Sequence, residues 1–445
     1  MSCNILNDIL IKKFGRDYAL LQRWNIISRV VRNYGLGSCI TNKEADIRSE
    51  NNWTHLLPTY GISNQNSTGR CWLYAALNCL RQEVNEKYEA NNFFFSVDYL
   101  AFYDLLEKAN YFLDTIIELA PIEALDRTVV EILQNPVQDA GQWHYFVDLV
   151  KKYGLVPECE MRPTVCSLNT SEMIRILNKM LRKDAAEIRN CYSKNKPVTK
   201  DGKEKKEMLF NVYSLLVTCL GEPCKAIGEI KIGKKVFPKE MTPQEFAAEC
   251  AGPLERFDEY IPLVNAPMKN RDFDKCYEIE YRKGMSDGSN VRLLNVRMEE
   301  MENLIMTQLS DGYPVWIGAD MSFYVDKKRE FCDESVMDLE SLTHQNMQIE
   351  KGDALELQVS KMTHSVVLKG FKTDERGNPV KWIAEDSHGT NADRKGLLTL
   401  TEDFMKKYVY EAVILRKYLK PSQISIYEGE AEKLPRWDPI GVLAR

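Results

Sequence analysis

Apolar residues near the start of the chain recur every three to four positions, which is the spacing of an amphipathic helix. Ile9 and Phe14 lie on one such face, and Leu20 begins a second. The sequence then becomes polar and irregular from residue 35 to residue 62. We therefore predict that residues 1–60 form an N-terminal arm that packs against the rest of the molecule or against a neighbouring subunit.

The helical period returns near residue 71 and continues to about residue 221. Helices are predicted at residues 71–88, 97–115, 122–134, 145–153 and 170–221, the last interrupted by a polar turn at 195–203.

Alternating and β-branched stretches dominate the second half of the chain. Strands are predicted at residues 230–237, 276–281, 291–296, 314–317, 362–368 and 380–384, with one helix at 299–309. Helices followed by strands indicate a fold of the α+β class.

Composition narrows the possible functions. A chain of 445 residues with 44% hydrophobic content buries a large core, and 59 basic against 65 acidic residues give no general attraction for nucleic acid. Apolar runs fall short of the ~18 residues that span a membrane, and the N-terminal stretch lacks the apolar core of a signal peptide. We expect a soluble, cytoplasmic protein that binds neither membranes nor nucleic acid.

The twelve cysteines are scattered, without a C-x-x-C pair or a histidine-rich cluster beside them. This pattern is typical of reduced intracellular thiols. We predict no metal site and no cofactor.

Cys71 stands where a loop of small residues gives way to a helical pattern. Backbone amides and the dipole at a helix start stabilise a thiolate, which is the nucleophilic form of cysteine. Gln65, six residues upstream, can fold back and donate to an oxyanion formed beside the sulfur. Taken alone, the two residues favour the alternative interpretation, a buried structural cysteine and a solvated loop glutamine.

His364 lies in the predicted strand at residues 362–368, and period two places it on a mostly apolar face. The next predicted strand ends shortly before Asp386. Two adjacent strands bring Asp386 within reach of His364, which is the pairing that a catalytic histidine needs. A hydrogen-bonded core histidine is the alternative interpretation. The weaker candidates among the histidines are His55, His144 and His344.

The segment around Cys71 resembles the nucleophile region of papain-like cysteine peptidases. It keeps Gly69, Cys71 and Trp72 of the pattern C-G-[SA]-C-[WY], but has Thr68 and Arg70 at the other two positions. The full stretch Asn-Gln-x-x-x-Gly-Arg-Cys-Trp is similar to the bleomycin hydrolase and aminopeptidase C branch. Further segments that resemble this branch lie at residues 92–96, 141–143, 314–318, 362–364, 395–396, 408–411 and 437–444.

This resemblance implies a papain-like fold with a helical left half and a β-barrel-like right half, a mainly helical insertion, and N- and C-terminal arms. The corresponding ranges are an arm at 1–60, the left half at 61–165, the insertion at 166–270, the right half at 271–430 and a C-terminal arm at 431–445.

The resemblance also implies a cysteine aminopeptidase that acts on short peptides with a free N-terminus and assembles as a homo-oligomer, typically a hexamer. Cys71 is then the nucleophile, His364 the general base and acid, and Asp386 its partner. Gln65 and the backbone N–H of Cys71 form the oxyanion hole. The residues implied for the substrate are Gly69, Trp72, Gly141, Ala444 and Arg445.

One segment departs from the family pattern. The family has Asn-Ser-Trp-Gly where this chain has Asp386-Ser387-His388-Gly389. An aspartate still accepts the histidine N–H, and its charge is expected to raise the histidine pKa, while loss of the tryptophan removes an apolar cover. A Cys-His-Asp set also occurs in papain-related acyltransferases, so acyl transfer and a non-catalytic peptide-binding scaffold remain alternative functions.

The C-terminal arm is predicted to lie in the substrate cleft. Pro435 and Pro439 stiffen it, and the residues from Gly441 to Ala444 are small and apolar. Its terminal carboxylate can pair with the α-ammonium group of a substrate and so select free N-termini. Because Arg445 adds a cation there, we expect that it points away or that the enzyme trims it.

Overall fold

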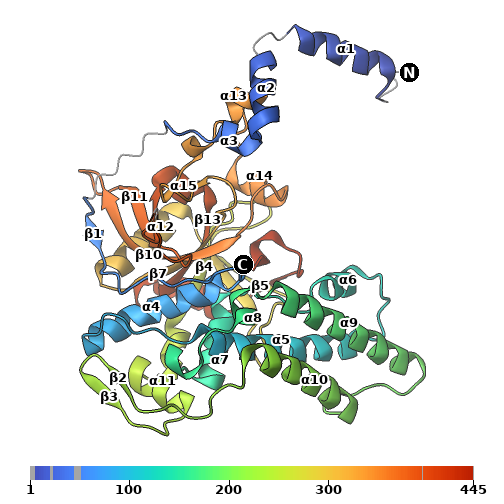
Figure 1. The fold of residues 1–445 in the computed structure, drawn as a ribbon, viewed down its shortest axis with the longest axis vertical. Coiled ribbons are helices and arrows are strands. Elements are labelled where there is room, and N and C mark those ends of the chain that lie inside the picture. The colour runs from blue at the N-terminus through green and yellow to red at the C-terminus, as the bar shows by residue number, and fades with distance from the viewer. Residues whose placement is uncertain (1–5, 21–23, 45–51, 393, 444–445) are drawn as a thin grey trace.

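The computed structural model describes residues 6–20, 24–44, 52–392 and 394–443. A large sheet and its helices form the upper part of the body in Figure 1, a bundle of helices forms the lower part, and an N-terminal arm projects from the top. Within the described ranges, every helix is too short or too polar to cross a membrane.

The N-terminal arm consists of α1 (Asp8–Ala19), α2 (Trp24–Tyr34) and α3 (Leu36–Ile40). Its end is tied to the body, because Ile40 O accepts a hydrogen bond from Asp338 N at 2.7 Å. The stretch from residue 35 to residue 62 is therefore less irregular than predicted: it holds α3 and also β1 (His55–Leu56), which pairs with the main sheet.

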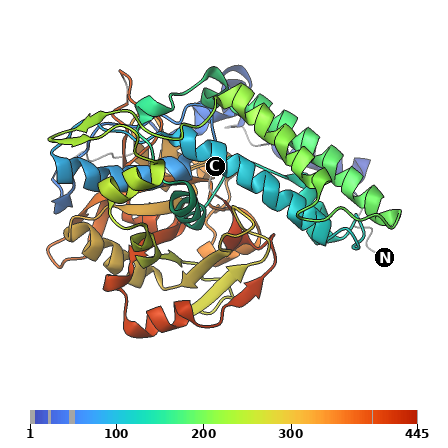
Figure 2. The same ribbon diagram turned by 90° about the horizontal axis from the view of Figure 1, so that it is seen from below.

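The helices of the lower part and the insertion are α4 (Cys71–Tyr88), α5 (Val97–Glu118), α6 (Arg127–Gln134), α7 (Trp143–Tyr153), α8 (Val165–Leu168), α9 (Ser171–Ser193), α10 (Lys203–Leu220) and α11 (Pro243–Ala251). In Figure 2, α9 and α10 lie side by side along α5. The stretch predicted as helical at residues 170–221, with a turn at 195–203, corresponds to these two helices. The buried residues Leu177, Leu181 and Ala185 follow one another at steps of four along α9, so one face of this helix packs on α5.

Predicted bounds differ from the structure at several elements, two of them for local reasons. The helix predicted at residues 122–134 begins at Arg127, because the Asp126 side chain accepts from the backbone N–H of Thr128 and caps the helix there. The strand predicted at 230–237 is a hairpin of β2 (Ile230–Ile232) and β3 (Lys235–Phe237), because Gly233 adopts a φ of 55° at the turn.

In the described part of the chain the main sheet has twelve strands. Eleven of them follow the order β14-β5-β6-β4-β13-β7-β10-β11-β12-β9-β8, with β1 added beside β10. Their bounds are β4 (Tyr260–Val264), β5 (Lys275–Ile279), β6 (Val291–Asn295), β7 (Val315–Ala319), β8 (Val325–Asp326), β9 (Phe331–Cys332), β10 (His364–Thr373), β11 (Pro379–Glu385), β12 (Leu397–Thr401), β13 (Val409–Leu415) and β14 (Glu432–Leu434). The helices around it are α12 (Met298–Ser310), α13 (Leu339–Thr343), α14 (Lys351–Glu356), α15 (Glu402–Tyr408) and α16 (Pro421–Glu428). Because β4 pairs with β6 and β13, the sheet begins before residue 270, within the range assigned to the insertion.

The pairing of β10 with β11 sets up the candidate site. The two strands are antiparallel, with Val367 opposite Glu385. The first residue of β10, His364, therefore lies at the same edge as Asp386, which follows β11 directly. This is the arrangement that the sequence predicts.

The two parts of the body meet along α4, which packs against β10 and β7. Trp316 donates its indole N–H to the carbonyl of Trp72 at 3.0 Å across this boundary. Arg81 of α4 forms an ion pair with Glu385 of β11 at 2.5 Å, and both side chains are almost completely buried. A buried pair of this kind is costly to break, so it fixes α4 against the strands that carry His364.

Candidate active site

Cys71 is the first residue of α4, and its side chain is fully buried. The residue before it, Arg70, is buried as well, and its guanidinium is held by Asp98 at 2.7 Å and by Asp139 at 3.5 Å. These ion pairs fix the residue from which the helix starts. The thiol therefore lies at the positive end of the helix dipole, as the sequence predicts.

His364 reaches the thiol from β10 and contacts both Cys71 and Asp386. Its Nε2 donates to Asp386 Oδ1 at 2.9 Å, which leaves Nδ1 for the thiol. Burial disfavours the charged imidazolium, but the neighbouring Cys71 and Asp386 outweigh it and raise the pKa of His364 to about 10. The charged form of the histidine is therefore favoured at neutral pH.

Asp386 has more partners than the sequence indicates. In addition to His364, the carboxylate accepts from His388 Nδ1 at 2.9 Å, from Arg394 Nη2 at 2.7 Å and from the backbone N–H of Ser387 at 2.9 Å. Burial alone would raise the pKa of this carboxyl, but the hydrogen bonds from His364 and His388 lower it well below its usual range. The carboxylate is therefore ionised.

His388 occupies the position of the family tryptophan. Its ring centroid lies 5.0 Å from that of His364, and its side chain is 34% exposed. The expected apolar cover is thus replaced by a polar ring. That ring adds a further hydrogen bond to Asp386, which a tryptophan at this position cannot make from an equivalent nitrogen.

The loop that carries Gln65 is bound to the segment that carries Asp386. Gln65 N donates to Ser387 O at 2.7 Å, and Gly389 N donates to Ser63 O at 2.8 Å. The Gln65 side chain accepts from Ser387 Oγ at 2.6 Å and donates one amide hydrogen to Thr68 O at 2.8 Å. Its nitrogen carries a second hydrogen, which is the one available for an oxyanion. The two halves of the candidate site are held in register by these contacts.

The three remaining described residues of the predicted substrate site lie around Asp139. Gly69 N donates to the Asp139 carboxylate at 3.3 Å, and Trp72 Nε1 donates to the Asp139 carbonyl at 2.6 Å. Gly141 faces the Trp72 ring so closely that a Cβ atom at this position would lie 2.3 Å from it. The structure therefore brings Gly69, Trp72 and Gly141 together beside Cys71.

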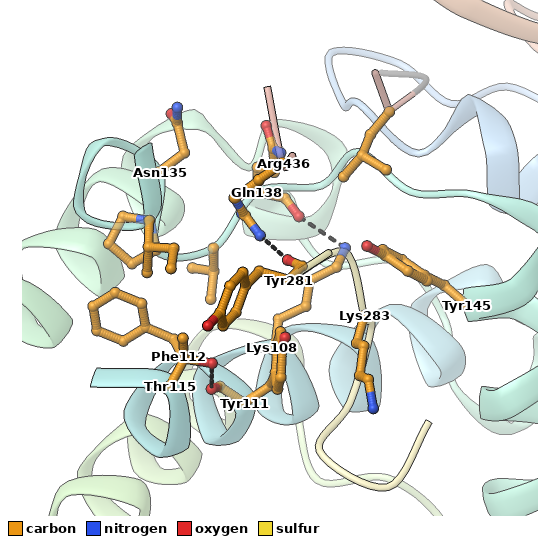
Figure 3. Close-up of a pocket in the computed structure, with 14 residues that line it drawn as sticks. Lys108, Tyr111, Phe112, Thr115, Asn135, Gln138, Tyr145, Tyr281, Lys283 and Arg436 are labelled. Carbon is orange, nitrogen blue, oxygen red and sulfur yellow. Dashed lines mark hydrogen bonds between the residues drawn. The ribbon is translucent and has the colours of Figure 1, made fainter. Parts of the chain in front are cut away.

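Lys108 supports the same turn from α5. It donates to Gln138 O at 3.0 Å, a contact drawn in Figure 3, and to Ala140 O at 2.8 Å. Lys108 and Gln138 line a small pocket, drawn in Figure 3, to which Arg436 and Leu443 of the C-terminal arm also contribute. Its volume of about 30 Å³ has room for about one or two water molecules, so it is a gap between arm and body and not a peptide subsite.

The C-terminal arm is docked along much of its length. β14 pairs with β5, Arg271 forms an ion pair with Asp438, and Arg127 stacks over the Trp437 ring at 4.1 Å. Ile440 and Leu443 are buried. Ala444 and Arg445 lie outside the described residues.

Gln142, next to Gly141, joins the arm to the sheet. Its amide nitrogen donates to Val442 O at 3.1 Å and to Glu411 of β13 at 3.0 Å. Burial raises the pKa of Glu411 to about 8, and the hydrogen bond from Gln142 offsets only part of this rise. Glu411 is therefore mostly uncharged at neutral pH.

One group of described side chains has ligating atoms close enough for a metal ion. These atoms belong to His364, Asp386 and His388 and lie within 4.8 Å of one another. Both histidines donate hydrogen bonds to the carboxylate, and the Arg394 guanidinium places a positive charge on its outer oxygen. That charge disfavours a second cation, so we interpret the group as a hydrogen-bonded unit around Asp386 and assign it no ligand role.

Several side chains of this site were not predicted from the sequence, Arg394, Gln142 and Glu411 among them. Arg394 lies in an irregular loop, where no periodicity indicates which way a side chain points. Gln142 appeared only as part of a matching segment, and Glu411 only as one residue of another. One signal for Arg394 was available in the sequence. It is a basic residue that lies eight positions after Asp386, and Asp386 itself replaces an uncharged asparagine of the family.

Comparisons with known proteins agree with this geometry. Residues 5–441 match the model of the Peptidase C1-like family. Aminopeptidase C of Streptococcus thermophilus is 30% identical over 97% of this chain and 98% of its own length, and aminopeptidase E of Lactobacillus helveticus is 31% identical over 97% and 98%. The crystal structure of PepW from Lactobacillus rhamnosis HN001 covers 100% of both chains with a TM-score of 0.94 at 30% identity. The α+β papain-like fold and the resemblance to the bleomycin hydrolase and aminopeptidase C branch are confirmed, and the chain belongs to the Peptidase C1-like family.

Proposed function

We propose that the protein is a cysteine aminopeptidase that removes N-terminal residues from short peptides. The observation that carries this proposal is the contact of His364 with Cys71 at the start of α4, with Asp386 behind the imidazole. Relatives that match nearly the whole chain are named aminopeptidases C, E and G, which supports the same activity.

The chemistry follows from these positions. His364 takes the thiol proton, and the Cys71 thiolate attacks the carbonyl carbon of the first peptide bond. The Gln65 amide and the Cys71 backbone N–H stabilise the oxyanion of the tetrahedral intermediate. The imidazolium then protonates the leaving amine, and water hydrolyses the thioester with His364 as general base.

The C-terminal arm supplies the selectivity for free N-termini in this proposal. It is bound next to Gly141 through Gln142 and Val442, which supports a place for the arm on the acyl side of the cleft. In this proposal a carboxylate at the end of the arm, beyond Leu443, pairs with the α-ammonium group of the substrate. Removal of Arg445 by the enzyme would leave that carboxylate on Ala444.

The test compares an aminoacyl amide with a free amine and the same compound with an acetylated amine. The proposal predicts release of the free amino acid from the first compound only, and loss of this activity in Cys71→Ala. Deletion of residues 442–445 is expected to admit the acetylated compound. Hydrolysis of the acetylated compound by the full chain would contradict the proposed exopeptidase specificity.

The same incubation separates the alternatives. The presence of Asp386, and not an amide, is the observation that favours an acyltransferase, because a Cys-His-Asp set occurs in papain-related acyl transfer. In that case an added amine would be recovered as a new amide. A peptide-binding scaffold would give neither a free acid nor a new amide.

We further propose that copies of this chain associate, with six as the expected number. The arm helix α1 has no buried residue, and Ile9, Phe14 and Leu20 are each more than half exposed although they are large and apolar. Figure 1 shows this arm extending away from the body, where a neighbouring copy can cover it. Removal of residues 1–34 is expected to reduce the molecular mass measured by light scattering to that of one chain.

A cytoplasmic location is part of the same proposal. The described cysteines are free thiols, Cys159 and Cys166 among them at exposed positions. Reduced thiols on the surface and a thiol nucleophile both fit a reducing compartment.

A further inference from the structure

The charge around the candidate catalytic histidine is arranged differently from that of an amide-assisted cysteine peptidase. An asparagine behind the imidazole adds no charge to the thiolate–imidazolium pair. Asp386 adds one negative charge beside the imidazole. The Arg394 guanidinium, whose Nη2 lies 2.7 Å from Asp386 Oδ2, adds one positive charge that offsets it. The two side chains are 3% and 17% exposed, so water screens this pair only weakly.

The geometry also divides the two carboxylate oxygens between different partners. Oδ1 accepts from His364 Nε2 and from the backbone N–H of Ser387, whereas Oδ2 accepts from Arg394. His388 Nδ1 lies 2.9 and 3.0 Å from the two oxygens and bridges them. These contacts hold the Asp386 carboxylate in one orientation. Because Arg394 binds Oδ2, Oδ1 is the oxygen that faces His364.

We propose that Arg394 is a positioning residue for His364: it holds Asp386 in the orientation that binds the imidazole and offsets the carboxylate charge, so that the Asp386–Arg394 pair replaces an amide. The expected effect on kcat rests on the proposed function. The expected effect on the pKa of His364 does not. Arg394 acts only through Asp386, and we assign it no contact with Cys71 or with a substrate.

Other charged or titratable groups also face this unit, and the expected pH dependence has to include them. The groups that interact with His364 or Asp386 are Cys71 on α4, Cys332 on β9, and His388 and Arg394 after β11. Two acidic residues bind neighbours of these groups: Asp320 after β7 accepts from Thr363, and Glu330 accepts from the backbone N–H groups of Lys395 and Gly396 beside Arg394. Burial raises the pKa of the Cys332 thiol, so this group is neutral and contributes no charge. Asp320 and Glu330 remain in all the variants below and therefore do not affect the comparison.

The sign of each substitution follows from Coulomb's law. Arg394→Met removes a positive charge, so the imidazolium is held more strongly and the basic limb of activity, where His364 loses its proton, moves to higher pH. Asp386→Asn removes a negative charge while Arg394 stays, so the same limb moves to lower pH. Because Arg394 acts from beyond the carboxylate, we expect an upward shift of about one pH unit or less, and a larger downward shift for Asp386→Asn.

The kinetic parameters separate positioning from substrate binding. Arg394→Met is expected to lower kcat while KM stays nearly unchanged, because the pair acts on the reacting groups. Arg394→Lys keeps the charge with a single donor and is expected to leave the basic limb near its original place. Arg394→Gln is a second neutral variant that keeps a hydrogen-bond donor, and it should shift the limb in the same direction as Arg394→Met.

The decisive measurement uses the rate at which iodoacetate alkylates Cys71, followed by mass spectrometry over a range of pH. An anionic reagent is attracted to the thiolate–imidazolium pair and loses this attraction when His364 is deprotonated, so its basic limb reports on His364 without any peptide. Arg376→Met, which removes an exposed arginine from the turn between β10 and β11, is the matched control and should shift nothing.

The outcomes are distinct. Opposite shifts in Arg394→Met and Asp386→Asn support the inference, even if no aminoacyl amide is hydrolysed, in which case only the proposed function fails. An unmoved or lowered limb in both neutral Arg394 variants overturns the inference, even if aminopeptidase activity is found. A shift in Arg394→Lys as large as that in Arg394→Met would overturn the role of the charge.

Discussion

The two ends of the candidate site are built by different means. At the Cys71 end, one continuous segment from Gln65 to Trp72 supplies the thiol, the amide and the turn, and the start of α4 sets their positions. At the Asp386 end, the carboxylate gathers partners from β10 and from a loop that extends to Arg394. A helix start depends on local backbone geometry and leaves little freedom, whereas a partner for an imidazole is defined by charge and hydrogen bonds that different residues can supply.

The largest effect is expected from Cys71→Ala. Removal of the nucleophile should lower kcat/KM for an aminoacyl amide by roughly 10⁶-fold, the order found when a hydrolase loses its nucleophile. The fold should persist, because a buried thiol is replaced by a slightly smaller side chain. Steady-state kinetics and circular dichroism of the same preparation test both statements.

Cys79→Ala is the matched control for this comparison. Cys79 lies on the same helix and is 8% exposed, but burial raises the pKa of its thiol and keeps it protonated. Its replacement should leave kcat/KM within a few-fold of the parent. An equal loss of activity in Cys71→Ala and Cys79→Ala would contradict the assignment of Cys71 as the nucleophile by its position at the start of α4.

The next effect in size concerns the segment that joins the two ends. Gln65→Ala should reduce kcat by about 10²–10³-fold, because an oxyanion donor is lost where charge develops. Ser387→Ala removes only the hydroxyl that donates to the Gln65 carbonyl oxygen and leaves the amide hydrogens in place. It should cost far less, and an equal loss in both variants would mean that Gln65 serves to hold the loop and not to bind the oxyanion.

A third prediction tests how tightly the Cys71 end is packed. Gly141→Ala places a methyl group 2.3 Å from the Trp72 ring, and Trp72 is itself 1% exposed. Overpacking of this kind should lower the free energy of unfolding by about 1–3 kcal/mol. Gly15→Ala in α1 meets nothing within 4 Å and should leave stability unchanged or slightly higher. Urea denaturation of both variants measures the difference.

The sequence predicts most of the Cys71 end because its signals are local. A loop of small residues, a helical period and a glutamine at fixed separation all lie within a few residues of one another. His364 and Asp386 could also be placed, since each begins or follows a predicted strand and antiparallel pairing brings the two positions together. Strand periodicity and turn residues carry that information without knowledge of the whole fold.

The other residues of the site come together through tertiary contacts, which produce no periodic pattern in the sequence. Arg394 lies in a loop without regular structure, and Gln142 meets Glu411 only because the residue before α7 lies against β13 across the boundary of the two parts. Several strands, β4, β12 and β13 among them, were not predicted from the sequence for the same reason. β4 reads as part of the insertion until its pairing with β6 and β13 is known.

The smallest effect is expected at the contact between Gln142 and the arm. Gln142 belongs to the helical part, Glu411 to the sheet, and Val442 to the arm, so one amide nitrogen joins all three. A single hydrogen bond contributes about 1 kcal/mol net, and the arm has independent anchors at Asp438 and Trp437. Gln142→Leu should therefore raise the rate with an N-acetylated aminoacyl amide, relative to the free one, by less than about tenfold. Glu411→Gln keeps a neutral group that can still accept from Gln142, since Glu411 is itself mostly uncharged at neutral pH, and this ratio should not change. A larger effect from Glu411→Gln than from Gln142→Leu would show that the carboxyl group of the sheet, and not the amide beside Gly141, determines how the arm is held.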